Sequence, residues 1–241
     1  MMTILRATER KYKQVREQQV WFTFHPQDRP ESPGQRFAAL ETLKESRLLP
    51  QKRSRNPPRG IELLTYVREG SLAYEDSTGQ TGIIRAGEFQ RVTAGMSIRY
   101  SQISSSCGSG VHVFQIRLCP TAGHQEPSHE RKRFSTAHRR GALCVVASQD
   151  ARQGSLRLHH DATVYSAILE CGQHIVHALR CGRAGWLHVV EGEVNIQGTV
   201  LATGDGAGVS AELSISFAAL KPSEVLLVDL VATDCSPDDE R

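Results

Sequence analysis

Apolar and polar residues alternate with a period of two along much of the first half of the chain, which is the pattern of strands with one buried face. Turns containing glycine are expected at Glu69-Gly70 and Ala86-Gly87. Short strands separated by such turns are typical of an antiparallel sandwich or barrel. The predicted strands lie in "VWFTFHP", "FAALETLKESRLLP", "IELLTYVRE", "SLAYEDS", "GIIRAGEFQRVTAG", "SIRYSQIS" and "VHVFQIRL". Residues 1–19 are predicted to be a charged lead-in with some helix.

The second half of the chain shows the same rhythm of strands and turns. Its segment "WLHVVEGEVNIQG" has the layout of "LLTYVREGSLAYEDSTG" in the first half, and "VVEGEV" and "VREGSL" occupy corresponding places. This weak internal repeat predicts two similar barrels. The glycine-rich "GDGAG" at residues 204–208 is interpreted as a turn, because a nucleotide-binding loop needs a following helix and a strand pattern follows here.

The boundary between the two barrels is predicted within residues 119–141. This segment is polar, basic and contains two prolines, which is typical of a linker. The expected organisation is therefore an N-terminal barrel over residues 1–118, a linker over 119–141 and a C-terminal barrel over 142–241.

Charge is distributed unevenly along the chain, although the net charge is only +3. Residues 1–120 hold 18 Lys or Arg and 11 Asp or Glu, a net of +7, whereas residues 142–241 hold 6 and 13, a net of −7. Either the two halves attract each other, or the basic half meets an anionic partner. Because no nucleic-acid motif accompanies the basic half, a nucleic-acid partner is not expected.

Two further observations concern cellular location and redox chemistry. The sequence contains neither a membrane-length apolar run nor a signal peptide, so a cytoplasmic protein without membrane association is expected. The six cysteines form no CxxC pair and are expected to be free thiols. Cys107, in the segment "SSSCGSG", is either a redox-sensitive thiol or an incidental surface cysteine.

Several segments, taken in order, resemble the pirin family, whose members are bicupins with two antiparallel jelly-roll β-barrels. The resemblance covers the chain from about "WFTF" to "LLVDL". It is carried by the segments "NPPRGIELLTYVREGSLAYEDS", "RAGEFQRVTAGMSIRYSQ" and "WLHVVEGEVNIQG". The resemblance implies an all-β fold of two cupin barrels. For typical members it also implies a metal ion held in the N-terminal barrel by three histidines and one glutamate.

All four metal-ligand positions are changed in this sequence. The resemblance places Asn56, Pro58 and Tyr100 where the family has histidine, and Gln102 where it has glutamate. Proline has no side-chain donor, and neutral amide oxygens are poor ligands for a transition metal. Tyrosine ligates only as a phenolate, whose formation is opposed by a pKa near ~10. We therefore expect no metal and no other cofactor, and the sequence resembles the metal-free members of the family.

The same positions are candidates for a metal-free pocket. Strand alternation predicts that Glu62 shares the interior with Asn56, Pro58, Tyr100 and Gln102. These side chains either fill the space of the lost metal or bind a small organic ligand. No catalytic residue is assigned.

Three functions are compatible with these observations. The preferred interpretation is a non-catalytic, pirin-like protein that binds a small molecule or a protein partner, with a role in stress response. The enzyme alternative is the family's metal-dependent quercetin 2,3-dioxygenase activity, and a third alternative is co-regulation of transcription.

Overall fold

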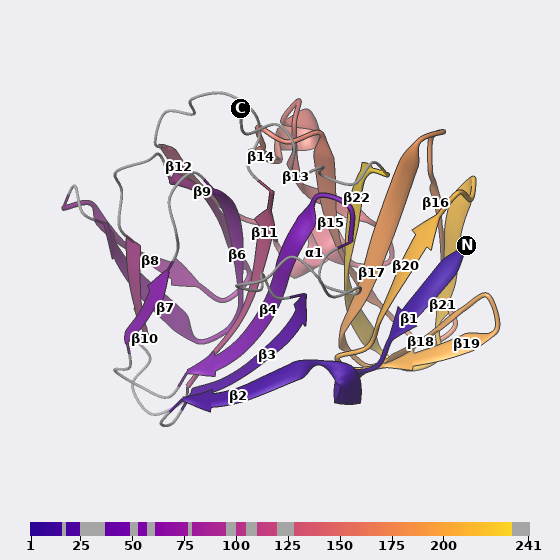
Figure 1. Cartoon of the computed structure of the whole chain (residues 1–241), viewed down its shortest axis with the longest axis horizontal. Coiled ribbons are helices and arrows are strands. Elements are labelled where there is room, and N and C mark those ends of the chain that lie inside the picture. Colours follow the sequence, from indigo (N-terminus) through magenta and orange to yellow (C-terminus); the bar gives the residue numbers. More distant parts are fainter. Residues whose placement is uncertain are drawn as a thin grey trace, which may run out of the picture. The chain divides into compact units, whose positions relative to one another are not determined.

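The computed structural model describes residues 1–15, 18–24, 37–48, 53–56, 61–76, 79–94, 100–104, 110–119 and 128–232 (Figure 1). Residues 53–56 and 100–104 are described by their backbone. The chain divides into two compact units. One comprises Lys11–Gln35 and Leu40–Phe134, and the other comprises Met1–Arg10, Arg36–Ala39 and Ser135–Arg241. We call them the N-terminal barrel and the C-terminal barrel.

The N-terminal barrel consists of two antiparallel sheets that share one core (Figure 1). The seven-stranded sheet has the order β12-β9-β6-β11-β4-β3-β2, and the four-stranded sheet has the order β5-β10-β7-β8. The strands are β2 (Lys11–Val15), β3 (Gln18–Phe24), β4 (Leu40–Leu48), β5 (Arg53–Asn56), β6 (Ile61–Glu69), β7 (Ser71–Asp76), β8 (Thr81–Arg85), β9 (Glu88–Ala94), β10 (Tyr100–Ser104), β11 (Val111–Leu118) and β12 (Ser128–Arg133).

The core of the N-terminal barrel defines which face of each strand points inward. It contains Leu48, Val67, Val92, Val111 and Val113 from the seven-stranded sheet, together with Leu72, Tyr74 and Ile84 from the four-stranded sheet. Because side chains alternate along a strand, residues two apart from these core members belong to the same inner face.

The C-terminal barrel repeats this plan. Its seven-stranded sheet has the order β1-β20-β17-β22-β15-β13-β14, and its four-stranded sheet has the order β16-β21-β18-β19. A continuous apolar core, including Leu187, Ile215, Phe217 and Leu227, fills the space between them. The strands are β1 (Met2–Leu5), β13 (Cys144–Ser148), β14 (Leu156–Arg157), β15 (Ala162–Leu169), β16 (His174–Ala178), β17 (Arg183–Glu191), β18 (Glu193–Ile196), β19 (Thr199–Ala202), β20 (Gly206–Ser210), β21 (Ser214–Ala219) and β22 (Ser223–Val231).

The predicted repeat corresponds to one turn that occurs in both barrels. Gly70 separates β6 from β7, and Gly192 separates β17 from β18, so each turn carries the chain from the seven-stranded to the four-stranded sheet. Their φ values are 77° and 91°, a region that glycine adopts without steric cost. The expected all-β class with two antiparallel barrels is confirmed.

The structure divides the chain at other places than the sequence predicts. Residues 2–5 form β1, which pairs with β20 of the C-terminal barrel. Within the predicted linker, residues 128–133 form β12, which pairs with β9, and Thr136–Arg139 form the helix α1. The sequence pattern predicted a linker here because β12 is an edge strand. Its side chains are largely exposed, so it lacks the apolar face that marks a strand in the sequence.

Helices are short in the described residues. Besides α1 there are two 3-10 turns, Ala7–Glu9 and Arg152–Gly154. No helix in this part of the chain has the length and apolar character needed to cross a membrane.

Candidate functional site

A row of polar residues crosses the inner face of the N-terminal barrel. Lys44 on β4 pairs with Gln115 on β11, Gln115 pairs with Thr65 on β6, and Thr65 pairs with Gln90 on β9. We call Lys44, Gln115, Thr65 and Gln90 the polar row. Their inward direction follows from the alternation, because Leu48, Val113, Val67 and Val92 lie two or four residues away on the same strands and belong to the core.

Three members of the polar row are buried, and Lys44 is half-buried. Thr65 and Gln90 expose no surface, and Gln115 exposes 4%. The amide of Gln115 donates a long hydrogen bond of 3.5 Å to the hydroxyl of Thr65. A polar row inside a barrel shows that the interior is not formed by apolar packing alone.

Lys44 is the charged member of the polar row. Loss of hydration on burial lowers the pKa of its ammonium from 10.5 to about 8. The neighbouring acids are bound elsewhere: Glu41 lies 2.8 Å from Arg117, and Glu45 lies 2.7 Å from His112. Among the described residues, no carboxylate forms an ion pair with Lys44.

The backbone register places three of the predicted pocket positions at the four-stranded sheet of this barrel. Position 100 pairs with position 56 on one side and with position 76 on the other, and position 102 pairs with Tyr74. Tyr74 is part of the core. Since paired positions share a face and alternate positions return to it, Asn56, Tyr100 and Gln102 occupy inner-face positions of the backbone. Pro58 and Cys107 lie outside the described residues.

Glu62 is placed differently from the other pocket candidates. It is buried and shares its face of β6 with Tyr66, whose ring stacks on Phe89 at 4.3 Å. The opposite face of β6 carries Thr65 and the core residue Val67. The predicted grouping of Glu62 with Asn56 is therefore wrong, because β5 and β6 belong to different sheets and strand alternation does not continue across a change of sheet.

On its own face, Glu62 lies in the electrostatic neighbourhood of a buried arginine. Desolvation lowers the pKa of Arg91, and the charges of Glu62 and Glu130 oppose that effect. The guanidinium also donates a 2.7 Å hydrogen bond to Thr93, which pairs with Glu62 across the strands. We therefore interpret Glu62 as a carboxylate that compensates the positive charge of the buried Arg91.

The residues at the four family ligand positions do not fit a transition metal. Their donor set would be an amide oxygen from Asn56, an amide oxygen from Gln102 and the phenol of Tyr100, with no donor from Pro58. In the part of the chain that the structure describes, no group of three or more His, Cys, Asp or Glu side chains could hold a metal ion.

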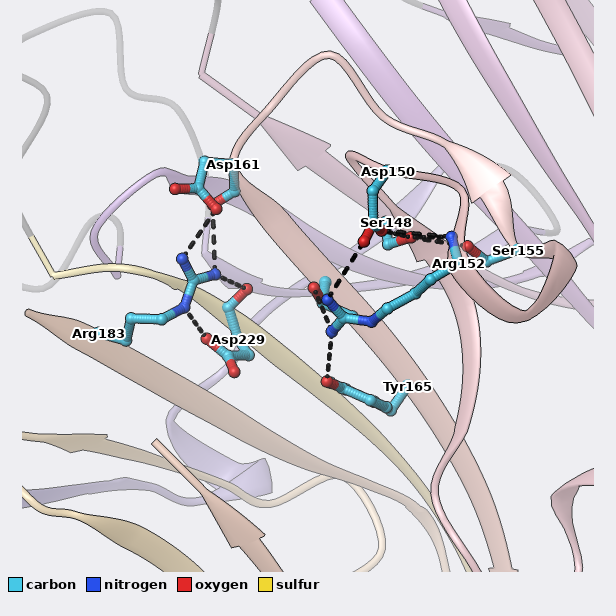
Figure 2. A network of polar contacts seen from close by, with 9 residues as sticks. Ser148, Asp150, Arg152, Ser155, Asp161, Tyr165, Arg183 and Asp229 are labelled. Carbon is cyan, nitrogen blue, oxygen red and sulfur yellow. Dashed lines mark hydrogen bonds and ion pairs between the residues drawn. The ribbon is translucent and has the colours of Figure 1, made fainter. Parts of the chain in front are cut away.

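The C-terminal barrel has a polar network at one end of its apolar interior (Figure 2). Arg183 lies between two acids, donating hydrogen bonds to Asp229 and to Asp161, the latter at 2.8 Å. His177 donates to the other oxygen of Asp229 at 2.8 Å. Arg152 donates to the hydroxyl of Tyr165 at 2.9 Å and so ties the segment after β13 to β15.

This network is internally compensated. Burial alone would raise the pKa of Asp229, but the hydrogen bonds and positive charges of His177 and Arg183 outweigh it and lower the pKa below its ordinary value. The Asp229 carboxylate is therefore ionised at neutral pH. Because both acids and Arg183 have partners within the network, we assign it to stability of the barrel end.

The histidines of the C-terminal barrel do not converge on one site among the described residues. His177 belongs to the network, whereas His174 is exposed and bonds to Ser216 at 2.8 Å. His188 and His160 are buried at separate positions.

The polar row was not predicted from the sequence. Its signal lies in polar residues within otherwise apolar strands, namely Lys44 in "LETLKESRL", Gln90 in "EFQRVTA" and Gln115 in "VHVFQIRL". Strand alternation alone cannot align these residues in one row, because the register between strands far apart in sequence is needed.

Two family models match the chain. Residues 5–118 match the model described as Pirin, and residues 145–230 match the model described as Quercetinase C-terminal cupin domain. The two matched ranges correspond to the two barrels, which identifies both as cupin folds.

Individual proteins and solved structures show the same similarity. Quercetin 2,3-dioxygenase of Escherichia coli (strain K12) is 33% identical over 231 residues, which cover 95% of this chain and 99% of that protein. The crystal structure of the bacterial pirin YhhW from Escherichia coli, in complex with nickel(II), superimposes with a TM-score of 0.89 at 32% identity and covers 97% of this chain and 100% of that one. A quercetin 2,3-dioxygenase from Acinetobacter baumannii shares the fold, with a TM-score of 0.76 at 14% identity over 95% of this chain and 79% of that one.

Proposed function

The chain belongs to the pirin family, and we propose that it is a metal-free, non-catalytic member that binds a small organic molecule inside its N-terminal barrel. Two observations together support this proposal: the changed ligand positions have inner-face register on the four-stranded sheet, and the polar row lies on the inner face of the seven-stranded sheet of the same barrel.

The loss of metal follows from the chemistry of the four positions. A transition metal needs imidazole, carboxylate or thiolate donors, and neither Asn56 nor Gln102 supplies one. Tyr100 would have to lose a proton to ligate. An ammonium at Lys44, on the inner face of the same barrel, would also repel a cation.

The small-molecule role follows from the nature of the interior. Ligand sites combine apolar walls with a few polar groups, and here the polar row lies beside the core residues Val67, Val92 and Val113. The C-terminal barrel differs, because its polar inner-face residues Asp229, His177 and Arg183 are bound to one another beside the apolar core. This contrast supports the N-terminal barrel as the binding site.

The second candidate function is quercetin 2,3-dioxygenase activity, after which a relative with 33% identity over 95% of this chain is named. Such activity would require a metal in the N-terminal barrel, which the residues present do not favour.

One experiment separates these functions. The purified protein is analysed for bound metals, loaded with iron, nickel or copper, and assayed for quercetin turnover. In parallel, its thermal unfolding is recorded with small carboxylates, sugars and flavonoids. We expect less than stoichiometric metal, no turnover above that of the free ions, and a rise in Tm with at least one class of compound. One tightly bound equivalent of metal with turnover would establish the dioxygenase instead, and a Tm unchanged by every compound would favour a protein partner.

A further inference from the structure

We propose that the ligand of the N-terminal barrel is a small carboxylate whose negative charge is paired with the ammonium of Lys44, beside Gln115 and Thr65. This inference rests on the proposed small-molecule function and specifies the chemical class of the ligand.

The first step is the charge balance of the barrel interior. A desolvated ammonium is unfavourable unless an anion compensates it. The two acids nearest to Lys44 in sequence have other partners, Arg117 for Glu41 and His112 for Glu45. Glu45 also lies on the opposite face of β4, since it is adjacent in sequence to Lys44. Among the described side chains Lys44 thus has no ion-pair partner, and an anionic ligand would supply one.

The second step is the geometry around this charge. Gln115 pairs directly with Lys44, and Thr65 pairs directly with Gln115, so an amide and a hydroxyl follow the ammonium in one row. On the other side of Lys44, the paired residue is the apolar Phe22. A carboxylate has acceptor sites for several donors at once, whereas a neutral ligand would leave the ammonium charge uncompensated.

The third step concerns the rest of the ligand. The next positions along the inner face are Ser46, Val113 and Val67, which are buried. An organic body attached to the carboxylate would contact the apolar side chains of Val113 and Val67, and this favours small organic acids over inorganic anions.

Other ionisable groups on the inner face are distinguishable from Lys44. Arg117 is paired with Glu41 at 2.8 Å, and Arg131 lies at the far end of the polar row, 3.8 Å from Glu88. The remaining ionisable side chains at inner-face positions, as far as the structure describes side chains, are Lys11, Lys13, Tyr74, His129 and Arg133. Lys11, Lys13, His129 and Arg133 are exposed, so they contact solvent.

The test compares carboxylates with amides of the same shape. Binding of benzoate and benzamide, and of acetate and acetamide, is measured by calorimetry and by ligand-observed NMR at constant ionic strength. The proteins are the full chain, Lys44→Gln, and the matched control Lys221→Gln, which removes an exposed lysine paired with Glu193 in the C-terminal barrel. Lys44→Met replaces Lys44→Gln if the latter does not fold.

We expect the unmodified chain and Lys221→Gln to bind the carboxylates at least about tenfold more tightly than the amides, a difference equivalent to one charge-assisted hydrogen bond. Lys44→Gln should lose this preference. Above pH 8 the affinity for benzoate should fall about tenfold per pH unit, because the free protein must first regain the proton on Lys44.

Two results would overturn the inference in different ways. Equal binding of carboxylates and amides, or a preference that survives in Lys44→Gln, would refute the role of Lys44 and leave the small-molecule function standing. Absence of binding by these probes, together with absence of stabilisation by sugars and flavonoids, would refute both.

Discussion

Nε2 of His177 lies 2.8 Å from Oδ2 of Asp229 and joins the two sheets of the C-terminal barrel, because His177 is on β16 of the four-stranded sheet and Asp229 is on β22 of the seven-stranded sheet. The other carboxylate oxygen of Asp229 accepts a hydrogen bond from Arg183. One carboxylate thereby holds the side chains of His177 and Arg183, and Figure 2 shows the contact with Arg183.

Replacing Asp229 with asparagine should destabilise the C-terminal barrel by about 3 kcal/mol at pH 7. The substitution removes the buried negative charge that compensates the guanidinium of Arg183. The pKa of Asp229 is lowered in the folded protein, so its contribution is complete above its ordinary pKa near ~4 and is lost as the pH falls through the folded value. The difference between Asp229→Asn and the unmodified chain should therefore shrink in acid.

Urea unfolding followed by tryptophan fluorescence measures this difference. The chain has two tryptophans, Trp21 in the N-terminal barrel and Trp186 in the C-terminal barrel, so a Trp21→Phe background reports on the C-terminal barrel alone. Asp161→Asn is the control, because Asp161 binds the same arginine but is 59% exposed, against 9% for Asp229. Its loss should stay below about 1 kcal/mol. Equal losses for the two variants would contradict the role given to burial.

Replacing Lys44 with methionine should stabilise the ligand-free N-terminal barrel. The pKa of Lys44 falls from 10.5 to about 8 on folding, which corresponds to a cost of roughly 3 kcal/mol below pH 8. Between these two values the unfolded chain binds more protons than the folded chain, so the stability of the unmodified protein should rise with pH from 8 to 10.5. Urea unfolding in a Trp186→Phe background should show this rise, and Lys44→Met should lack it. A pH-independent difference would show that Lys44 is not desolvated.

The sequence predicted those features of the fold that depend on local signals. The Glu-Gly turns at Gly70 and Gly192 have their expected positions, because each needs a residue with positive φ between two alternating strands. The strands β1 and β12 were missed, because they are edge strands whose partners lie far away in sequence and whose own side chains show little apolar alternation.

At the candidate site, the comparison with the sequence concerns only the backbone register and the placement of single residues. Positions 56, 100 and 102 have inner-face register, as the alternation within β5 and β10 predicts. Glu62 was misplaced, because the inward and outward alternation along one strand does not determine which residues face inward on the next strand when that strand belongs to another sheet. Lys44 was missed because its charge suggested an exposed position, and only the pairing with Gln115 places it inside.

Replacing Gly206 with alanine should destabilise the C-terminal barrel by about 1 to 3 kcal/mol through overpacking. A Cβ on Gly206 would overlap the indole ring of Trp186, which is only 2% exposed. The cost should be smaller in a Trp186→Phe background, because the smaller ring recedes from the new methyl group. Thermal unfolding followed by circular dichroism measures both costs, and an equal cost in the two backgrounds would place the strain elsewhere.

Restoring the family's ligands tests whether these positions alone determine metal binding. The variant with Asn56→His, Pro58→His, Tyr100→His and Gln102→Glu should bind one equivalent of nickel(II), since it supplies three imidazoles and a carboxylate. Adding Lys44→Gln should tighten binding by about tenfold or more, because it removes a like charge from the barrel interior. Calorimetry with nickel(II) at pH 7 measures both effects, with the single Lys44→Gln variant as the control that should bind none. Nickel binding by the unmodified chain at equal affinity would contradict the metal-free assignment. If Lys44→Gln left the affinity for nickel(II) unchanged, the ammonium of Lys44 would not act electrostatically on the metal position.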